Sequence, residues 1–167
     1  VMPDKRKFGV AANLIEGIGV DGLFIEQPKY VGMDRSQRPY QISATSAAQK
    51  HESDDQVLLQ GPKADIFLNT SGWIAINSNQ GVYNRSNQVL DLSGDVTIFH
   101  DKGYEFRTKA LKIDLLNGIG SSTTQVNVRG LAGEISSQGF KISRQGTRVL
   151  FTGKSIAILR GSRRSDL

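Results

Sequence analysis

Apolar and polar residues alternate in short runs along most of the chain. The clearest run is Leu111-Lys112-Ile113-Asp114-Leu115, with an apolar residue at every second position. This period of two is typical of strands that have one buried and one exposed face. The same alternation occurs in residues 40–44, 74–76, 90–92, 96–98, 104–106, 126–128, 140–142 and 156–158. The pattern predicts an all-β protein built from antiparallel strands.

Polar segments that contain glycine or asparagine separate these runs. They are Asp101-Lys102-Gly103, Leu116-Asn117-Gly118, Ser137-Gln138-Gly139, Gln145-Gly146 and Thr152-Gly153. Such residues favour tight turns, so we expect a connection between two strands at each of them. Only residues 8–17 and 44–50 are compatible with helix. The second of these segments continues a strand-like run, and a strand or a bulge fits it equally well.

Two stretches of the chain resemble each other when one is shifted by 36 residues. Residues 92–108 read LSGDVTIFHDKGYEFRT, residues 128–144 read VRGLAGEISSQGFKISR, and residues 38–43 form a weaker third copy. The alignment pairs Gly94 with Gly130, Gly103 with Gly139, Tyr104 with Phe140 and Phe106 with Ile142. A repeat of this kind indicates a unit that buries its apolar face by stacking on copies of itself. We therefore expect Phe106 and Ile142 to face one interior, with unpaired docking strands beyond the repeat.

Composition limits the class of protein. The 167 residues fit one domain, and an apolar content of 38% suits a thin or elongated core. The absence of cysteine excludes disulfides, a thiol nucleophile and cysteine-ligated metal. No run reaches the roughly 18 apolar residues of a membrane-spanning helix. The chain begins at Val1 with no signal peptide, which is expected of a soluble fragment of a longer protein.

Positive charge gathers at the C-terminal end. The net charge is +5, and the last 27 residues alone carry seven basic side chains and one acidic side chain. One interpretation is a solvated edge with a disordered basic tail. The other is a surface that faces phosphates or an acidic partner. The charge pattern leaves both open.

No group of residues predicts catalysis. His51 and His100 are isolated, and the acidic residues near position 54 are typical of a solvated loop. The Gly17-Ile18-Gly19 motif lacks the flanking strand and helix of a dinucleotide-binding loop. Trp73 follows a predicted turn and is expected in the core or at its rim. We expect no enzymatic activity, no metal and no cofactor.

For an all-β chain of short strands, the alternation pattern does not decide the role of the edge strands or the nature of the interior. Unclosed sheets expose edge strands, which can be blunted or can add a strand from a partner. The apolar faces of two curved sheets form either a packed core or, where the sheets part, a groove for an acyl chain. Periodicity alone favours the packed core.

The chain resembles the periplasmic lipopolysaccharide-export family LptC. The resemblance begins in Gln27-Pro28-Lys29-Tyr30-Val31-Gly32, a strand of the form P-x-h-x-G, and continues in the aromatic-led strand of residues 38–47. Further matches are Gly72-Trp73, Gly81-Val82-Tyr83, residues 90–96, residues 103–110, Val128-Arg129-Gly130 and Gly139-Phe140. Each motif is weak alone, but their order and spacing are specific over about residues 20–160.

The resemblance implies a fold and a function. The fold is a twisted, boat-shaped antiparallel β-jellyroll with two curved sheets and open edges. The domain takes lipopolysaccharide from an inner-membrane ATP-driven ABC transporter complex and passes it to a periplasmic bridge protein of the same fold. It lies in the periplasm, tethered to the inner membrane by an N-terminal helix that this chain lacks. The soluble bridge protein itself and a structural β-module that assembles edge to edge are the alternatives.

A third hypothesis, a nucleic-acid binder, is suggested only by the high pI of the chain. The scarcity of aromatic side chains on which bases could stack argues against it.

Strand parity and the resemblance predict two sets of site residues. Residues expected to line a lipid groove are Ile42, Phe67, Ile76, Val96, Ile98, Phe106 and Ile142. Residues expected at partner-binding edges are Tyr30, Val31, Ile156 and Ile158. Gly130 is expected to permit close strand packing or a bulge. The predicted organisation is a disordered or partly helical segment at 1–19, one β-jellyroll domain at 20–160 and a basic tail at 161–167.

Overall fold

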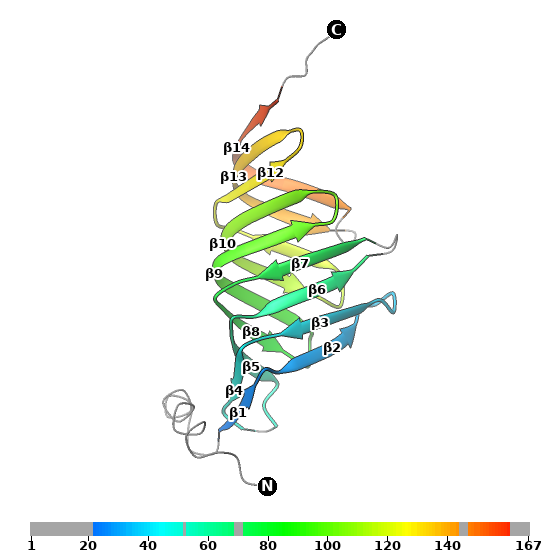
Figure 1. Cartoon of the computed structure of the whole chain (residues 1–167), viewed down its shortest axis with the longest axis vertical. Coiled ribbons are helices and arrows are strands. Elements are labelled where there is room, and N and C mark those ends of the chain that lie inside the picture. Colours follow the sequence, from blue (N-terminus) through cyan, green and yellow to red (C-terminus); the bar gives the residue numbers. More distant parts are fainter. Residues whose placement is uncertain (1–21, 52, 69–71, 144–146, 161–167) are drawn as a thin grey trace.

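The computed structural model describes residues 22–51, 53–68, 72–143 and 147–160. These residues form one hydrogen-bonded network of 14 antiparallel strands (Figure 1). The strands are β1 (Leu23–Glu26), β2 (Lys29–Met33), β3 (Pro39–Ser43), β4 (Ser46–Gln49), β5 (Gln56–Gln60), β6 (Lys63–Phe67), β7 (Trp73–Asn77), β8 (Gln80–Asn84), β9 (Val89–His100), β10 (Tyr104–Asp114), β11 (Ile119–Ser122), β12 (Val126–Gly130), β13 (Gly133–Ser143) and β14 (Arg148–Leu159). The predicted all-β class is confirmed, and residues 46–49 of the ambiguous segment form a strand.

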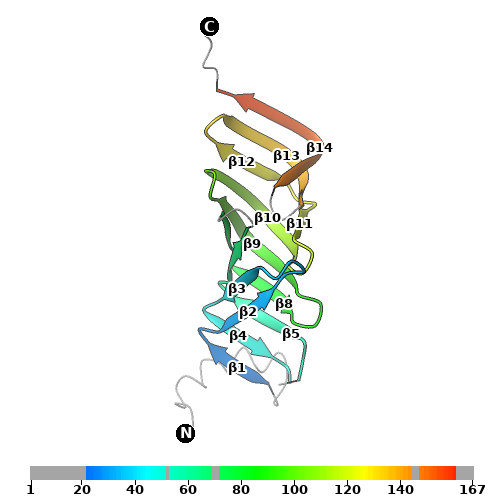
Figure 2. The same ribbon diagram turned by 90° about the vertical axis from the view of Figure 1, so that its right-hand side faces the viewer.

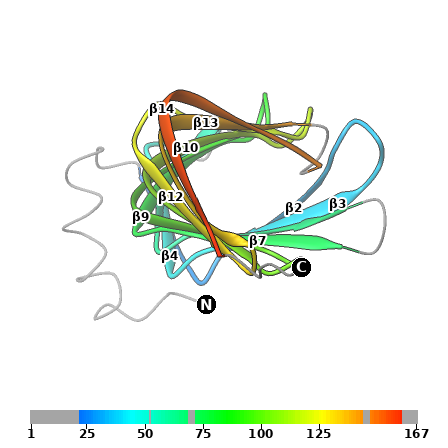
Figure 3. The ribbon, with the colours of Figure 1, turned by 90° about the horizontal axis from the view of Figure 1, so that it is seen from above.

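The strands form two layers that run along an elongated molecule (Figures 1 and 2). Layer A contains β1, β4, β5, β8 and β11, and layer B contains β2, β3, β6, β7 and β12. The long strands β9, β10, β13 and β14 belong to both layers. Seen from above, the layers meet along one side and diverge on the other (Figure 3). This arrangement is the antiparallel β-jellyroll that was predicted.

The long strands pass from one layer to the other. In β9, residues 89–93 pair with β8 of layer A, whereas residues 97–100 pair with β7 of layer B. In β10 the layer-B partner is β12 and the layer-A partner is β11. In β13 the layer-B partner is again β12 and the layer-A partner is β11. Each long strand therefore bends once, near its middle.

Irregular backbone marks the bend in every long strand. In β9, Gly94 and Asp95 have positive φ angles of 79° and 47°. The register of β10 shifts between Thr108 and Ala110, and that of β13 shifts between Ser137 and Gly139. In β14, Gly153 has a φ of 73°. Bulges of this kind bend a strand and increase its twist, which lets one strand serve two layers.

Two of the predicted turns are wrong, because these segments form bends within long strands and not connections between strands. Ser137-Gln138-Gly139 and Thr152-Gly153 lie inside β13 and β14, at the bends. Asp101-Lys102-Gly103 and Leu116-Asn117-Gly118 are turns, as expected. The aligned repeats consequently differ in structure, because Gly103 lies in a turn and Gly139 lies in a strand. Phe106 and Ile142 nevertheless belong to the same buried cluster, as predicted.

The core lies between the layers and is almost entirely aliphatic and aromatic. Phe106 and Phe140, the aromatics of the two repeat copies, contact each other with ring centroids 5.7 Å apart. The largest fully buried side chains include Tyr40, Phe140, Ile42, Leu59, Leu90, Ile98, Val57, Val96 and Val126. Full burial of a side chain such as leucine or isoleucine stabilises the fold by roughly 1.5–3 kcal/mol. In strands such as β5 and β7, alternate residues provide the buried face.

Several predictions concern residues outside the described part of the chain. They are the segments at 1–19 and 161–167, the helix-compatible segment at 8–17 and the turn at Gln145-Gly146. Within the described ranges, no helix is long and apolar enough to cross a membrane.

Candidate functional site

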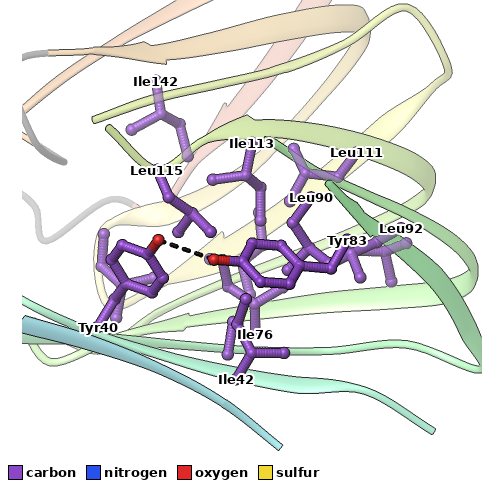
Figure 4. Packing of buried hydrophobic residues seen from close by; sticks show 14 of the residues in the cluster. Tyr40, Ile42, Ile76, Tyr83, Leu90, Leu92, Leu111, Ile113, Leu115 and Ile142 are labelled. Atoms are coloured by element: carbon purple, nitrogen blue, oxygen red, sulfur yellow. Dashed lines mark hydrogen bonds between the residues drawn. The ribbon is translucent and has the colours of Figure 1, made fainter. Parts of the chain in front are cut away.

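An apolar cavity lies between the layers, near the middle of the molecule. Layer B contributes Ile66, Ile74 and Ile76 to its wall, and layer A contributes Ile113 and Ile142. Figure 4 shows part of the buried cluster, which includes the cavity residues Ile76, Ile113 and Ile142. Almost all of the surface that lines the cavity is apolar. The wall of the cavity therefore suits an alkyl chain.

The cavity is small in this conformation. Its volume is about 50 Å³, whereas ligand pockets commonly measure roughly 300–1,000 Å³. An acyl chain therefore fits only if the layers move apart. Antiparallel layers that are joined along one side can diverge on the other without breaking strand pairs.

Two turns from opposite layers are hydrogen-bonded beside the cavity. The β2–β3 turn contains Arg35, whose backbone N–H donates to the carbonyl oxygen of Leu116 in the β10–β11 turn at 2.8 Å. The Nε of Arg35 also donates to Oδ1 of Asn117 at 2.9 Å. We call residues 34–38, which make this connection, the strap. The strap limits how far the layers can separate on their open side.

A buried aspartate organises the strap. Asp34 accepts hydrogen bonds from the backbone N–H groups of Ser36 at 2.8 Å and Arg38 at 2.9 Å. Its other oxygen accepts from Nε of Arg38 at 2.9 Å. Burial raises the pKa of Asp34, but the hydrogen bonds from Arg38 and Ser36 outweigh it and hold the pKa below its ordinary value. Asp34 is therefore ionised at neutral pH.

A second polar connection crosses the interior. The hydroxyl groups of Tyr40 in layer B and Tyr83 in layer A lie 3.0 Å apart (Figure 4). Gln88, in the turn just before β9, donates to the Tyr40 hydroxyl at 2.6 Å and to the carbonyl oxygen of Met33 at 3.0 Å. We call Met33, Tyr40, Tyr83 and Gln88 the clasp. Burial raises the pKa of Tyr83 well above its ordinary value, and the hydrogen bond with Tyr40 adds to this.

The clasp explains the glycine of the Pro28-Lys29-Tyr30-Val31-Gly32 motif. Gly32 lies directly opposite Tyr40 in the β2–β3 pair, and a Cβ at position 32 would collide with the Tyr40 ring. A similar contact occurs at Gly130, where a Cβ would lie 2.6 Å from Cδ1 of Tyr104. Close packing at Gly130, one of the two expected roles, is therefore what the structure shows. Each glycine lets a neighbouring aromatic ring lie flat on the sheet.

Six of the seven predicted groove residues are buried in the core. Ile76, Ile98 and Ile142 line the cavity, and Ile42, Val96 and Phe106 pack in the same buried cluster. The seventh, Phe67, is 49% exposed but also contributes to the cavity lining. It lies at the cavity rim opposite Trp73, which is 46% exposed. Ile66 takes the inward position. Contact of these residues with lipid remains a prediction.

The predicted partner-binding residues lie on strands with one free edge. Tyr30 and Val31 belong to β2, and Ile156 and Ile158 belong to β14. Among the described residues, β2 pairs only with β3 and β14 pairs only with β13. Val31 and Ile158 are both 67% exposed, whereas Tyr30 is half-buried and packs on Tyr83. Binding of a partner at either edge remains a prediction.

Three features of the site were not predicted. The strap and the clasp depend on contacts between residues more than 40 positions apart, such as Tyr40 and Tyr83. The short spacing from Asp34 to Arg38 is the only local signal for the strap. Phe151 of β14 was also missed: it lies opposite Phe140, packs against the core and extends the apolar interior to the last strand.

The site has the character of a binding surface. Among the residues that the structure describes, no three His, Cys, Asp or Glu side chains gather to hold a metal ion. His100 lies at a turn, where its Nδ1 accepts a hydrogen bond from the N–H of Lys102 at 3.1 Å. The arrangement as a whole is that of an elongated β-jellyroll with an apolar interior and free edge strands.

Comparison with known proteins identifies the family. The family described as "Lipopolysaccharide-assembly, LptC-related" matches residues 19–157, and the chain belongs to this family. A search of curated proteins found no match. The family match confirms the resemblance that the sequence predicted. The chain has a role in lipopolysaccharide transport and is a transport component, not an enzyme.

Proposed function

We propose that the chain carries the acyl chains of lipopolysaccharide between its layers and passes the lipid from one end to the other. The observation that carries this proposal is the continuous apolar interior between free strands at opposite ends. It begins at Ile25 and Tyr30, which pack against the cluster from β1 and β2, and includes Ile98 and Ile142. It ends at Phe151 in β14, which packs against the same cluster.

The physical basis of the proposal is the transfer of methylene groups out of water. Burial of each methylene is worth roughly 0.8 kcal/mol, so a lipid with several acyl chains is held strongly. The apolar part of the wall offers no hydrogen bonds to methylene groups, so the methylene groups can slide along it. The energy for directed movement comes from the inner-membrane ABC transporter complex.

We infer that the two ends bind different partners. The edges of β1 and β2 would face the transporter complex, and the edge of β14 would add a strand from the periplasmic bridge protein. Charge supports the second assignment, since Arg148, Lys154 and Arg160 are exposed on β14 or just after it. An acidic edge on the bridge protein would complement them. In this proposal the domain lies in the periplasm and is tethered to the inner membrane.

Site-specific photocrosslinking tests the lipid path. Ile142 lines the cavity, whereas its neighbour Lys141 is exposed on the outer face of the same strand. A photoreactive residue at 142 should capture lipopolysaccharide in cells, and the same residue at 141 should not. Equal capture at both positions would rule out an interior path.

A further inference from the structure

The guanidinium group of Arg38 is buried with two of its nitrogens unused. Its side chain is 11% exposed, and Nε is engaged by Asp34. Nη1 and Nη2 are inaccessible to solvent and have no partner among the described residues. A buried charged donor without an acceptor destabilises the fold. The unpaired edge of Arg38 therefore favours any ligand that brings an acceptor oxygen.

Arg38 borders the apolar cavity. The polar residues with which it shares the cavity lining include Asp34 and Asp114. Both oxygens of Asp114 already accept hydrogen bonds from Asn117, from the backbone N–H at 3.0 Å and from Nδ2 at 2.8 Å. No described side chain thus accepts from the Nη1–Nη2 edge of Arg38, and a ligand would reach this edge once the layers part.

Charge around the cavity narrows the choice of ligand. The lining combines one guanidinium group with the carboxyl groups of Asp34 and Asp114. A phosphate group would add a charge of about −1.5 to −2 beside these carboxyl groups. A neutral carbonyl oxygen has two lone pairs and can accept from both nitrogens without adding charge. The charge balance of the lining therefore favours a neutral hydrogen-bond acceptor over an anionic one.

We propose that Arg38 binds the carbonyl oxygen of the ester or amide bond that joins an acyl chain to its head group. The acyl chain would lie among Ile66, Ile74 and Ile113, and the lipid head group would remain outside, next to the strap. This inference rests on the proposed function, because it assumes that acyl chains occupy the interior. It adds that Arg38 fixes the depth to which a chain enters and selects acyl lipids over simple alkyl compounds.

A pair of neutral detergents tests this assignment in the purified chain. Sucrose monododecanoate has an ester carbonyl next to its 12-carbon chain, and dodecyl maltoside has an ether in its place. Below their micelle concentrations, the wild-type chain should bind the ester on the order of tenfold more tightly, as expected for a hydrogen bond from a charged donor. Arg38→Met should bring the ratio close to one and leave ether binding nearly unchanged.

Matched variants control for charge and for folding. Arg107→Met removes an arginine that is 68% exposed on the outer face, and it should keep the wild-type ratio. Arg38→Lys retains the charge with different geometry and should give an intermediate ratio. The wild-type ratio is informative even if Arg38→Met does not fold. A wild-type ratio near one, or an unchanged ratio in a folded Arg38→Met, would overturn the assignment.

A third ligand separates a carbonyl site from an anion site. Dodecyl phosphate should bind no more tightly than the ester. Much tighter binding that depends on Arg38 would instead identify a phosphate site and contradict the proposal. If neither neutral detergent binds, the proposed function fails together with the role of Arg38. If both bind equally, the apolar groove stands and only the role of Arg38 fails.

Discussion

The hydroxyl groups of Tyr40 and Tyr83 lie 3.0 Å apart and join the two layers through the middle of an apolar core. Both side chains are almost completely buried. A lipid that moves along the interior must pass this contact or separate it. The clasp is thus expected to stabilise the closed form of the groove.

Removal of one hydroxyl group should weaken the closed form. Tyr83→Phe deletes the hydrogen bond with Tyr40 and should lower the free energy of unfolding by about 1 kcal/mol. The same change should speed the uptake of a fluorescent acyl probe, because the layers part more easily. Tyr104→Phe, on a ring that is 43% exposed, is the matched control and should change neither quantity. Slower uptake by Tyr83→Phe would show that the clasp does not restrain the layers.

Alkaline pH should open the same contact. The pKa of Tyr83 is raised in the folded chain, first by burial and then by its bond with Tyr40. Its stabilising effect is therefore complete below the ordinary tyrosine pKa of about 10 and is lost progressively as the pH rises above that value. Thermal unfolding followed from pH 8 to pH 11 should show this loss in the wild type. The loss should be smaller in Tyr83→Phe, and identical pH profiles would contradict the assignment.

Gly32 should be intolerant of a side chain. Gly32→Ala places a methyl group against the Tyr40 ring, and such overpacking costs roughly 1–3 kcal/mol. Gly120→Ala is the control, because its Cβ would lie 3.8 Å from Cδ1 of Leu111, an ordinary contact. Chemical denaturation measures both variants. A Gly32→Ala variant as stable as the control would mean that Tyr40 can move aside freely.

The two ends of the molecule should lose different partners. Val31 on β2 and Ile158 on β14 have the same exposed fraction, so the same substitution can be compared at both. Ile158→Asp should weaken binding of the bridge protein on the order of tenfold and leave binding of the transporter complex intact. Val31→Asp should do the reverse. Copurification of each partner measures the effect, and loss of both partners in either variant would argue against separate edges.

Local sequence predicted the strands but could not predict their bends. Asp101-Lys102-Gly103 and Ser137-Gln138-Gly139 look alike, yet the first is a turn and the second is a bulge within β13. The difference depends on which strands lie alongside, and this is decided by distant parts of the chain. The inward positions of Ile76, Ile98 and Ile142 followed from alternation. Alternation did not show that Phe67, next to the inward Ile66, would be half exposed at the cavity rim.

The polar contacts that shape the site were harder still to predict. Asp34 and Arg38 are four positions apart, but nothing local shows that Nη1 and Nη2 of Arg38 are buried beside a cavity. The family resemblance supplied the function and the general fold. The strap, the clasp and the role of Gly32 emerge only from the three-dimensional arrangement.

The central claim is that the layers move apart to admit acyl chains, since the cavity of about 50 Å³ is too small at rest. The chain has no cysteine, so spin labels can be attached at introduced cysteines alone. Labels at Lys63 in layer B and Lys112 in the layer-A part of β10 lie on the outer faces, and labels at Lys112 and Lys141 provide a control within layer A. Pulsed electron paramagnetic resonance should show a longer distance between positions 63 and 112 when lipopolysaccharide is added, with no change between 112 and 141. An unchanged distance between 63 and 112 with bound lipopolysaccharide would contradict the account.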